Sequence, residues 1–176
     1  MSQEHARVAD AKPSSGSRRA QALADRIEEG ANLLAAFAEK LTDAEWRTPV
    51  SKTDRRPIGV IVHHVGNMYP IEIDAARAVA SGKALMDVTW EAVAGINAKH
   101  AQEQSNVTKT AAIELLRKNS RDAAAAVRRF TDAELDQVAP FGLTFGAPVT
   151  AQFVIEDHAL RHAWHHLAKI RSALTR

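Results

Sequence analysis

The amino-acid sequence predicts an all-α protein: a four-helix bundle of antiparallel helices, with an extra short helix and a Gly/Pro-rich loop or small hairpin before the last helix. Apolar residues recur at helical spacing in four long segments, which are joined by polar connections. Alanine is abundant, whereas residues that favour strands are thinly spread. The 176 residues suffice for one domain with a single core, expected over residues 17–176.

The first helix is expected from Ser17 to about Leu41, after a mobile lead-in over residues 1–16. The Ser17 hydroxyl can accept hydrogen bonds from the first free N–H groups of such a helix. Its apolar residues form one stripe: Leu23, Ile27, Leu33, Leu34, Phe37 and Leu41. A single stripe predicts a helix with one face in the core and the other in solvent.

The second helix is expected from Pro57 to a stop at Gly82, after a loop over Thr42–Arg56. Proline suits the first turn of a helix, because its missing N–H would have no partner there. Pro70 lies inside the same segment. It predicts a local kink rather than a break, because the apolar pattern resumes in phase beyond it.

Two further helices are expected in the middle of the chain. The shorter one runs from Thr89 to about Gln104, and the longer one runs from Thr108 or Thr110 to about Phe130. Because only a few residues separate them, the two helices are expected to be nearly continuous.

The segment between residues 131 and 149 holds two prolines and two glycines around Phe141, Leu143 and Phe145. It predicts a loop or a short hairpin whose aromatic side chains cover one end of the bundle. The last helix is expected to start at Thr150 and to run nearly to the C-terminus.

Charge and composition argue against several classes of protein. The 23 basic residues are interleaved with 21 acidic ones, which gives a net charge of +2 and no basic stripe for nucleic acid. No segment approaches the roughly 20 apolar residues of a membrane span, and residues 1–19 contain no apolar leader core. The chain has no cysteine, which fits a reducing compartment. We therefore expect a cytoplasmic protein that binds neither nucleic acid nor a membrane.

Six of the eight histidines fall in two short segments, residues 63–64 and 158–166. Positions i and i+4 share a helix face, so His162 and His166 can direct two imidazoles at one ion. At about 100° per residue, both lie on one flank of the apolar arc of the last helix. His158 and His165 fall nearly opposite the centre of that arc, where an ordinary solvated or hydrogen-bonded role is expected.

The second helix offers a third candidate ligand. His64 lies on the flank of its apolar face, whereas His63 points roughly the other way. A single flank histidine is more often solvated or hydrogen-bonded, so for His64 the two interpretations stay even, and for His63 the ordinary one is preferred. His5 and His100 receive no role from the pattern. Three imidazoles bind zinc, nickel or iron(II) and leave positions open for water or substrate.

Two glutamates lie close to the middle of the apolar arcs of the histidine-bearing helices, Glu72 and Glu156. An unpaired carboxylate is costly in such a position. Either one could orient a ligand imidazole or act as a general base at a metal, which makes both candidate catalytic residues. An ion pair with an arginine such as Arg77 or Arg161 is the commoner role for each.

These segments resemble the DinB-like (YfiT-like) family of helical bundles over about residues 18–174. The resemblance is carried by the segment from Pro57 to Val65, which contains His64, and by His162-Ala-Trp-His-His166 in the last helix. It implies an open site in which three histidines, here His64, His162 and His166, hold a divalent metal, often zinc or nickel. The family's frequent Gly-Gln beyond the last histidine is Ala168-Lys169 here.

The family also contains thiol-dependent S-transferases and the mycothiol-dependent maleylpyruvate isomerase. The resemblance therefore implies an enzyme in which a metal activates a thiol or water toward a small electrophilic substrate. Because the chain has no cysteine, the thiol would come from a low-molecular-weight cosubstrate. A metal-dependent hydrolase, which needs Glu72 or Glu156 as base, and a non-catalytic metal-binding or dimerisation module are the alternatives. The resemblance also favours a homodimer, at an interface that the sequence does not define.

Overall fold

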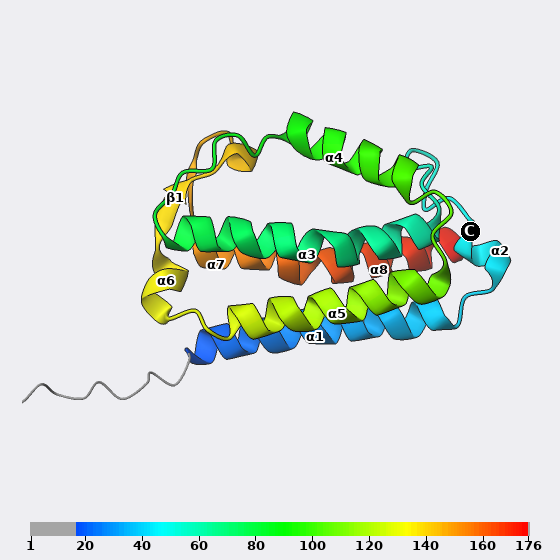
Figure 1. Ribbon diagram of the computed structural model, residues 1–176, viewed down its shortest axis with the longest axis horizontal. Coiled ribbons are helices and arrows are strands. Elements are labelled where there is room, and N and C mark those ends of the chain that lie inside the picture. The colour runs from blue at the N-terminus through cyan, green and yellow to red at the C-terminus, as the bar shows by residue number, and fades with distance from the viewer. Residues whose placement is uncertain (1–16, 176) are drawn as a thin grey trace, which may run out of the picture.

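The structure of the protein, a computed structural model, describes residues 17–175. Four long helical segments form its body (Figure 1). They are α1 (Arg18–Glu39), α3 (Ile58–Ala80), α5 (Lys109–Val127) and a last helix made of α7 (Ala151–Val154), η2 (Ile155–Leu160) and α8 (Arg161–Leu174). α1 and α3 each contact both α5 and the last helix, which closes a ring around one core. The predicted all-α four-helix bundle is confirmed. The expected lead-in, residues 1–16, lies outside the described residues.

Side-chain caps begin most of the helices where the sequence predicted them. Ser17 caps α1, and threonines cap α4 (Trp90–Glu103), α5 and α7. Two short helices, α2 (Asp43–Trp46) and α6 (Asp132–Asp136), each begin with a reciprocal threonine–glutamate capping box. Both were expected to be loops, because four or five residues are too few to show a helical period.

α4 changes the direction in which the bundle helices run. α1 and α5 are antiparallel, as are α3 and the last helix, but α3 and α5 run in the same direction (Figure 1). The reason is α4, which carries the chain back along α3 before α5 begins. α4 lies outside the ring, on the side of α3 and α8 that faces away from α1 and α5. The expectation that α4 and α5 are nearly continuous is therefore wrong, since the chain reverses over residues 104–108.

A two-stranded hairpin precedes the last helix, which confirms the hairpin form of the prediction. β1 (Val138–Pro140) pairs antiparallel with β2 (Pro148–Thr150), and a 3₁₀ turn, η1 (Gly142–Thr144), lies between them. Leu85 fastens the hairpin to the chain after α3, since its N–H donates to Pro140 O and its carbonyl accepts from Gly142 N. Phe141 is buried, but Phe145 is 90% exposed, so only the first of these aromatics covers the bundle.

α3 and α5 make the most extensive contact in the bundle. α3 continues through Pro70, whose missing N–H leaves the Gly66 carbonyl without its helical donor. Asn119 Nδ2 on α5 donates to this carbonyl at 2.9 Å. A Cβ atom at Gly66 would lie 2.8 Å from the Leu116 Cα atom, so the glycine is required for this approach.

The core inside the ring is aliphatic and rich in alanine. Small buried residues recur along α1, where they let α5 and the last helix come close: Ala20, Ala24, Ala31, Ala35 and Ala38. Larger side chains such as Ile27, Ile61 and Leu116 fill the space between the helices. Among residues 17–175, no helix combines the length and the apolar character that crossing a bilayer requires.

Candidate metal centre

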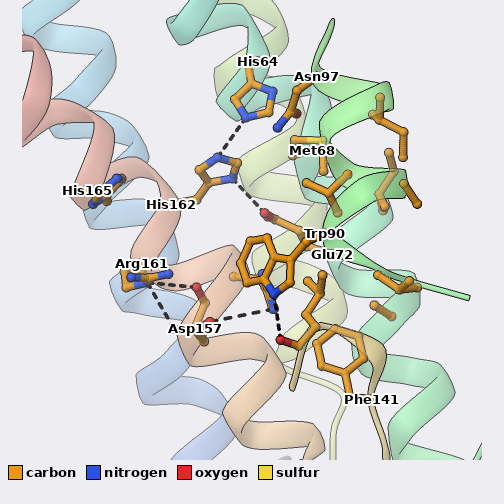
Figure 2. A pocket seen from close by; sticks show the side chains of 18 of the residues that line it. His64, Met68, Glu72, Trp90, Asn97, Phe141, Asp157, Arg161, His162 and His165 are labelled. Atoms are coloured by element: carbon orange, nitrogen blue, oxygen red, sulfur yellow. Dashed lines mark hydrogen bonds and ion pairs between the residues drawn. The ribbon is translucent and has the colours of Figure 1, made fainter. Parts of the chain in front are cut away.

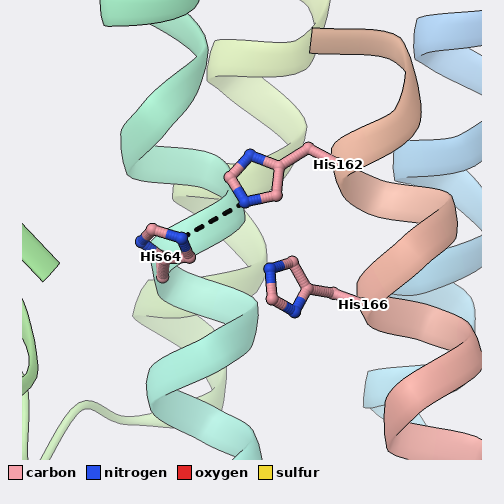
Figure 3. A group of neighbouring side chains, drawn as sticks. All are labelled: His64, His162 and His166. Atoms are coloured by element: carbon pink, nitrogen blue, oxygen red, sulfur yellow. Dashed lines mark hydrogen bonds between the residues drawn. The ribbon is translucent and has the colours of Figure 1, made fainter. Parts of the chain in front are cut away.

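Three histidines from α3 and α8 converge between the two helices (Figure 3). His64 Nε2 lies 3.2 Å from His162 Nε2, and one ring nitrogen from each of His64, His162 and His166 lies within 4.8 Å of the others. Two nitrogens bound to one tetrahedral zinc at about 2.0 Å stand about 3.3 Å apart. The cluster therefore has the spacing of a metal site after small side-chain adjustments.

Burial keeps two of the three rings neutral. His64 and His166 are 4% and 7% exposed. Burial, with a smaller contribution from His162, lowers the pKa of His64 to about 2. The pKa of His166 is lowered in the same way, first by burial and then by His162 and His64. Neutral imidazole is the form that binds a metal, so neither His64 nor His166 has to lose a proton near neutral pH.

Glu72 stands beside the cluster, on α3 and two turns after His64. Its Oε1 atom lies 2.7 Å from His162 Nδ1, an ion-pair distance between two largely buried side chains (Figure 2). The pair does not meet hydrogen-bond geometry, and Glu72 Oε2 is buried without a partner. A carboxylate here favours a proton on Nδ1 of His162, which leaves the lone pair on Nε2, the nitrogen that faces His64.

Glu156 is exposed and accepts a hydrogen bond from Gln152 Nε2, so its predicted place in the apolar arc is wrong. The reason is η2, a π-helical segment that adds a residue to the helix. If the whole segment were an α-helix, the residues 7 and 11 positions before the buried Ala163, namely 156 and 152, would lie on the same buried face. The structure buries Ile155 and Ala151 instead, a shift of one residue.

The same shift brings His158 inward, contrary to the sequence analysis. Its side chain is 20% exposed and its ring lies edge-on to Phe141, with the ring centroids 5.6 Å apart. Its pKa is lowered, chiefly by burial. His165 is exposed, close to the expected position.

A pocket of about 340 Å³ opens beside the histidines, between α3, α4, α8 and the hairpin. Its walls are mostly aliphatic and aromatic: Met68, Ile71, Trp90, Val93, Ile96, Phe141 and Leu143. Figure 2 shows His64 at one end and Phe141 at the other. Trp90 Nε1 donates to Leu143 O at 3.0 Å, which ties the start of α4 to the hairpin. An apolar pocket with a few convergent polar groups is typical of a small-molecule site.

Three residues near the histidine cluster were missed in the sequence analysis. His100, on α4, is buried, and its Nε2 lies 2.8 Å from His63 Nδ1, which links α4 to α3. Asn97, also on α4, has a buried Oδ1 without a partner. Arg56 lines the pocket from the loop before α3. No pattern marks these residues, because their partners lie far along the chain or in an irregular loop.

Comparisons with known proteins agree with the observed fold. The fold is similar to that of YfiT from Bacillus subtilis, described as a probable metal-dependent hydrolase with an unusual four-helix bundle topology. The TM-score is 0.71 with 17% identity, over 94% of this chain and 93% of that chain. No curated protein matches the sequence. The family model of the DinB superfamily matches residues 26–170, which is most of the chain. The chain therefore belongs to the DinB superfamily.

Proposed function

We propose that the protein is a metal-dependent hydrolase, with His64, His162 and His166 as ligands of one divalent cation. The observation that carries the proposal is the convergence of three largely buried imidazoles at the polar end of an apolar pocket. Three nitrogen ligands favour zinc or nickel, with iron(II) as a further option, and leave room for a water molecule. When bound, such a cation lowers the pKa of that water and polarises a carbonyl oxygen.

The chain's own residues would divide the remaining work. Glu72 Oε1 lies against Nδ1 of His162 and favours a proton on that nitrogen, while its unpartnered Oε2 atom can accept a proton from the attacking water. The apolar walls exclude bulk water, which strengthens each electrostatic interaction inside the pocket. Glu156 is exposed and outside the pocket lining, so we assign it no catalytic role.

The free carboxylate oxygen of Glu72 is the reason to prefer water over a thiol as the nucleophile. A hydrolase needs a base next to the water, and Oε2 supplies one, whereas a thiol ionises more readily without help. Transfer of a low-molecular-weight thiol to an electrophile uses the same three ligands and is the second candidate, on the family resemblance alone. The two differ in whether turnover requires added thiol.

Elemental analysis of protein purified without a histidine tag tests the metal site directly. We expect about one equivalent of zinc or nickel per chain, lost in a His166→Ala variant. A His165→Ala variant is the matched control, because it removes the exposed neighbouring imidazole and should retain the metal. Wild-type protein that holds no metal even after reconstitution would overturn the proposal.

Activity measurements then separate the two nucleophiles. Wild-type, His166→Ala and Glu72→Gln proteins are assayed against aryl esters and amides, with and without a small thiol. Hydrolysis without thiol, lost in His166→Ala and reduced at least about 100-fold in Glu72→Gln, supports the hydrolase. Turnover only with thiol present would replace it with the transferase.

A further inference from the structure

Arg56 is held rigidly at the polar end of the pocket by its neighbour Asp54. The Arg56 Nε and Nη2 atoms donate to the two carboxylate oxygens of Asp54 at 2.9 and 2.7 Å. Its carbonyl also accepts a hydrogen bond from Val50 N at 3.1 Å. Such a two-point contact fixes the plane of the guanidinium group and lowers the pKa of the Asp54 carboxyl.

One nitrogen of this guanidinium is left without a partner. Nη1 is buried and makes no hydrogen bond within the described residues. A buried N–H group of a charged side chain costs free energy when it has no hydrogen-bond acceptor. The free Nη1 atom therefore indicates that a ligand supplies an acceptor there. Arg56 lines the pocket together with His64 and His166, and its charge reaches both rings as a minor cause of their lowered pKa values, after burial.

Two other carboxylates of the pocket lie beside basic groups, and a third, Asp87, is a further acidic group of the lining. Glu72 lies against His162, and Asp157 pairs with Arg161 at 3.2 Å near the far end. The remaining lining is largely apolar and runs along α4 toward Phe141. A ligand that satisfies both ends therefore has an oxygen-bearing head near Arg56 and an apolar body.

We propose that Arg56 Nη1 is a substrate-binding group that donates to the acyl oxygen of carboxylic esters or amides with an apolar body. This inference rests on the proposed hydrolase and specifies its substrate class. Water adds to the acyl carbon, the bond to the leaving oxygen or nitrogen breaks, and the leaving atom takes a proton. The acyl oxygen gains negative charge during the addition, so a fixed guanidinium donor stabilises it more strongly than in the ground state. The carboxylate product keeps the same contact.

Binding of a product-like probe tests the assignment without any need for turnover. Phenylacetate and phenylethanol share the same apolar body, and only the first has a carboxylate. Calorimetric titrations on wild-type, Arg56→Gln, Arg56→Lys and Arg55→Gln proteins are run in metal-free and in metal-loaded form. Arg55 is an exposed arginine in the same loop, so its variant controls for the loss of one charge.

We expect Arg56→Gln to weaken phenylacetate binding tenfold or more in both forms, with phenylethanol unchanged and Arg55→Gln within twofold of wild type. Arg56→Lys keeps the ion pair with Asp54 and should also bind phenylacetate less tightly, because it lacks the forked donors. This variant decides the question if Arg56→Gln fails to fold.

Unchanged phenylacetate affinity in a folded Arg56 variant, or no binding of either probe to wild-type protein, would overturn the inference. A crystal structure of the wild-type complex adds a readout that needs no variant, since a probe oxygen must lie within about 3.2 Å of Nη1. Failure of metal loading with intact Arg56-dependent binding would instead count against the proposed hydrolase and leave the anion contact standing.

Discussion

α5 and α4 both lie against α3, but they meet it in opposite ways. α5 buries one face of small and aliphatic residues and approaches the backbone of α3 at Gly66. α4 buries only His100 among its 14 residues, and its apolar side chains Val93 and Ile96 face a pocket rather than a neighbouring helix. Close packing supplies stability on the first side, whereas incomplete packing creates space for a ligand on the second.

One substitution made on each side tests this difference. Gly66→Ala should destabilise the protein by about 2 kcal/mol, the largest effect expected here. The added Cβ would lie 2.8 Å from backbone atoms of Leu116, which cannot move without shifting α5. This strain exceeds the gain of about 1 kcal/mol that alanine brings to a helix interior. Urea unfolding measures the change, and a stability equal to wild type would show that the two helices are not in close contact.

A drop in pH should lower the free energy of unfolding through the histidines in and next to the pocket. Six histidines in or next to the pocket have lowered pKa values, with burial as the main cause: His63, His64, His100, His158, His165 and His166. In the unfolded chain these histidines bind protons near pH 6.5, whereas in the folded protein they bind protons only at lower pH. Above pH 6.5 they are neutral in both states, so their contribution to stability is complete there. As the pH falls toward the pKa values of the folded protein, protons bind to the unfolded chain first and stability is lost progressively.

Chelator-treated protein should therefore lose unfolding free energy between about pH 6.5 and 5, before the carboxylates titrate. His64→Gln should show a flatter profile over this interval, because one of the most strongly shifted groups is gone. Urea unfolding at a series of pH values measures both profiles. Parallel profiles for the two proteins would contradict the assignment of the effect to His64.

The smallest expected effect is a gain. Gly95→Ala in α4 should stabilise the protein by about 0.5–1 kcal/mol, because alanine restricts the unfolded chain and favours the helix. A Cβ atom at Gly95 has nothing within 4 Å, in contrast to the one at Gly66. The opposite signs of the two Gly→Ala changes would confirm the comparison, and a loss of stability in Gly95→Ala would contradict it.

Local signals in the sequence predicted most of the helices and the pairing of His162 with His166, whereas the family resemblance was needed to add His64. The caps Ser17, Thr89, Thr108 and Thr150 and the i, i+4 spacing of His162 and His166 act over a few residues, so a single segment contains the information. Whether these histidines bind a metal stays a prediction. The position of α4 depends on contacts such as His63 with His100, 37 residues apart, which no local pattern records.

The π-helical segment explains the other main error. A calculation at 100° per residue assumes an unbroken α-helix, so it holds for residues 161–174 and fails upstream of them. The wrong placement of Glu156 and His158 has this single cause. Arg56 was missed for a different reason, because its importance lies in an unsatisfied Nη1 atom that only the folded loop shows.

The π-helical segment also sets the direction in which the hairpin lies around the last helix, and it does so without changing the spacing of His162 and His166. Removing one residue from residues 155–160 would restore a continuous α-helix and turn everything upstream by about 100° relative to His162 and His166. This rotation would carry His158 and the Phe141 wall away from the pocket. The one extra residue of the π-helical segment thus aligns the His158 and Phe141 end of the pocket with the end formed by the histidine cluster.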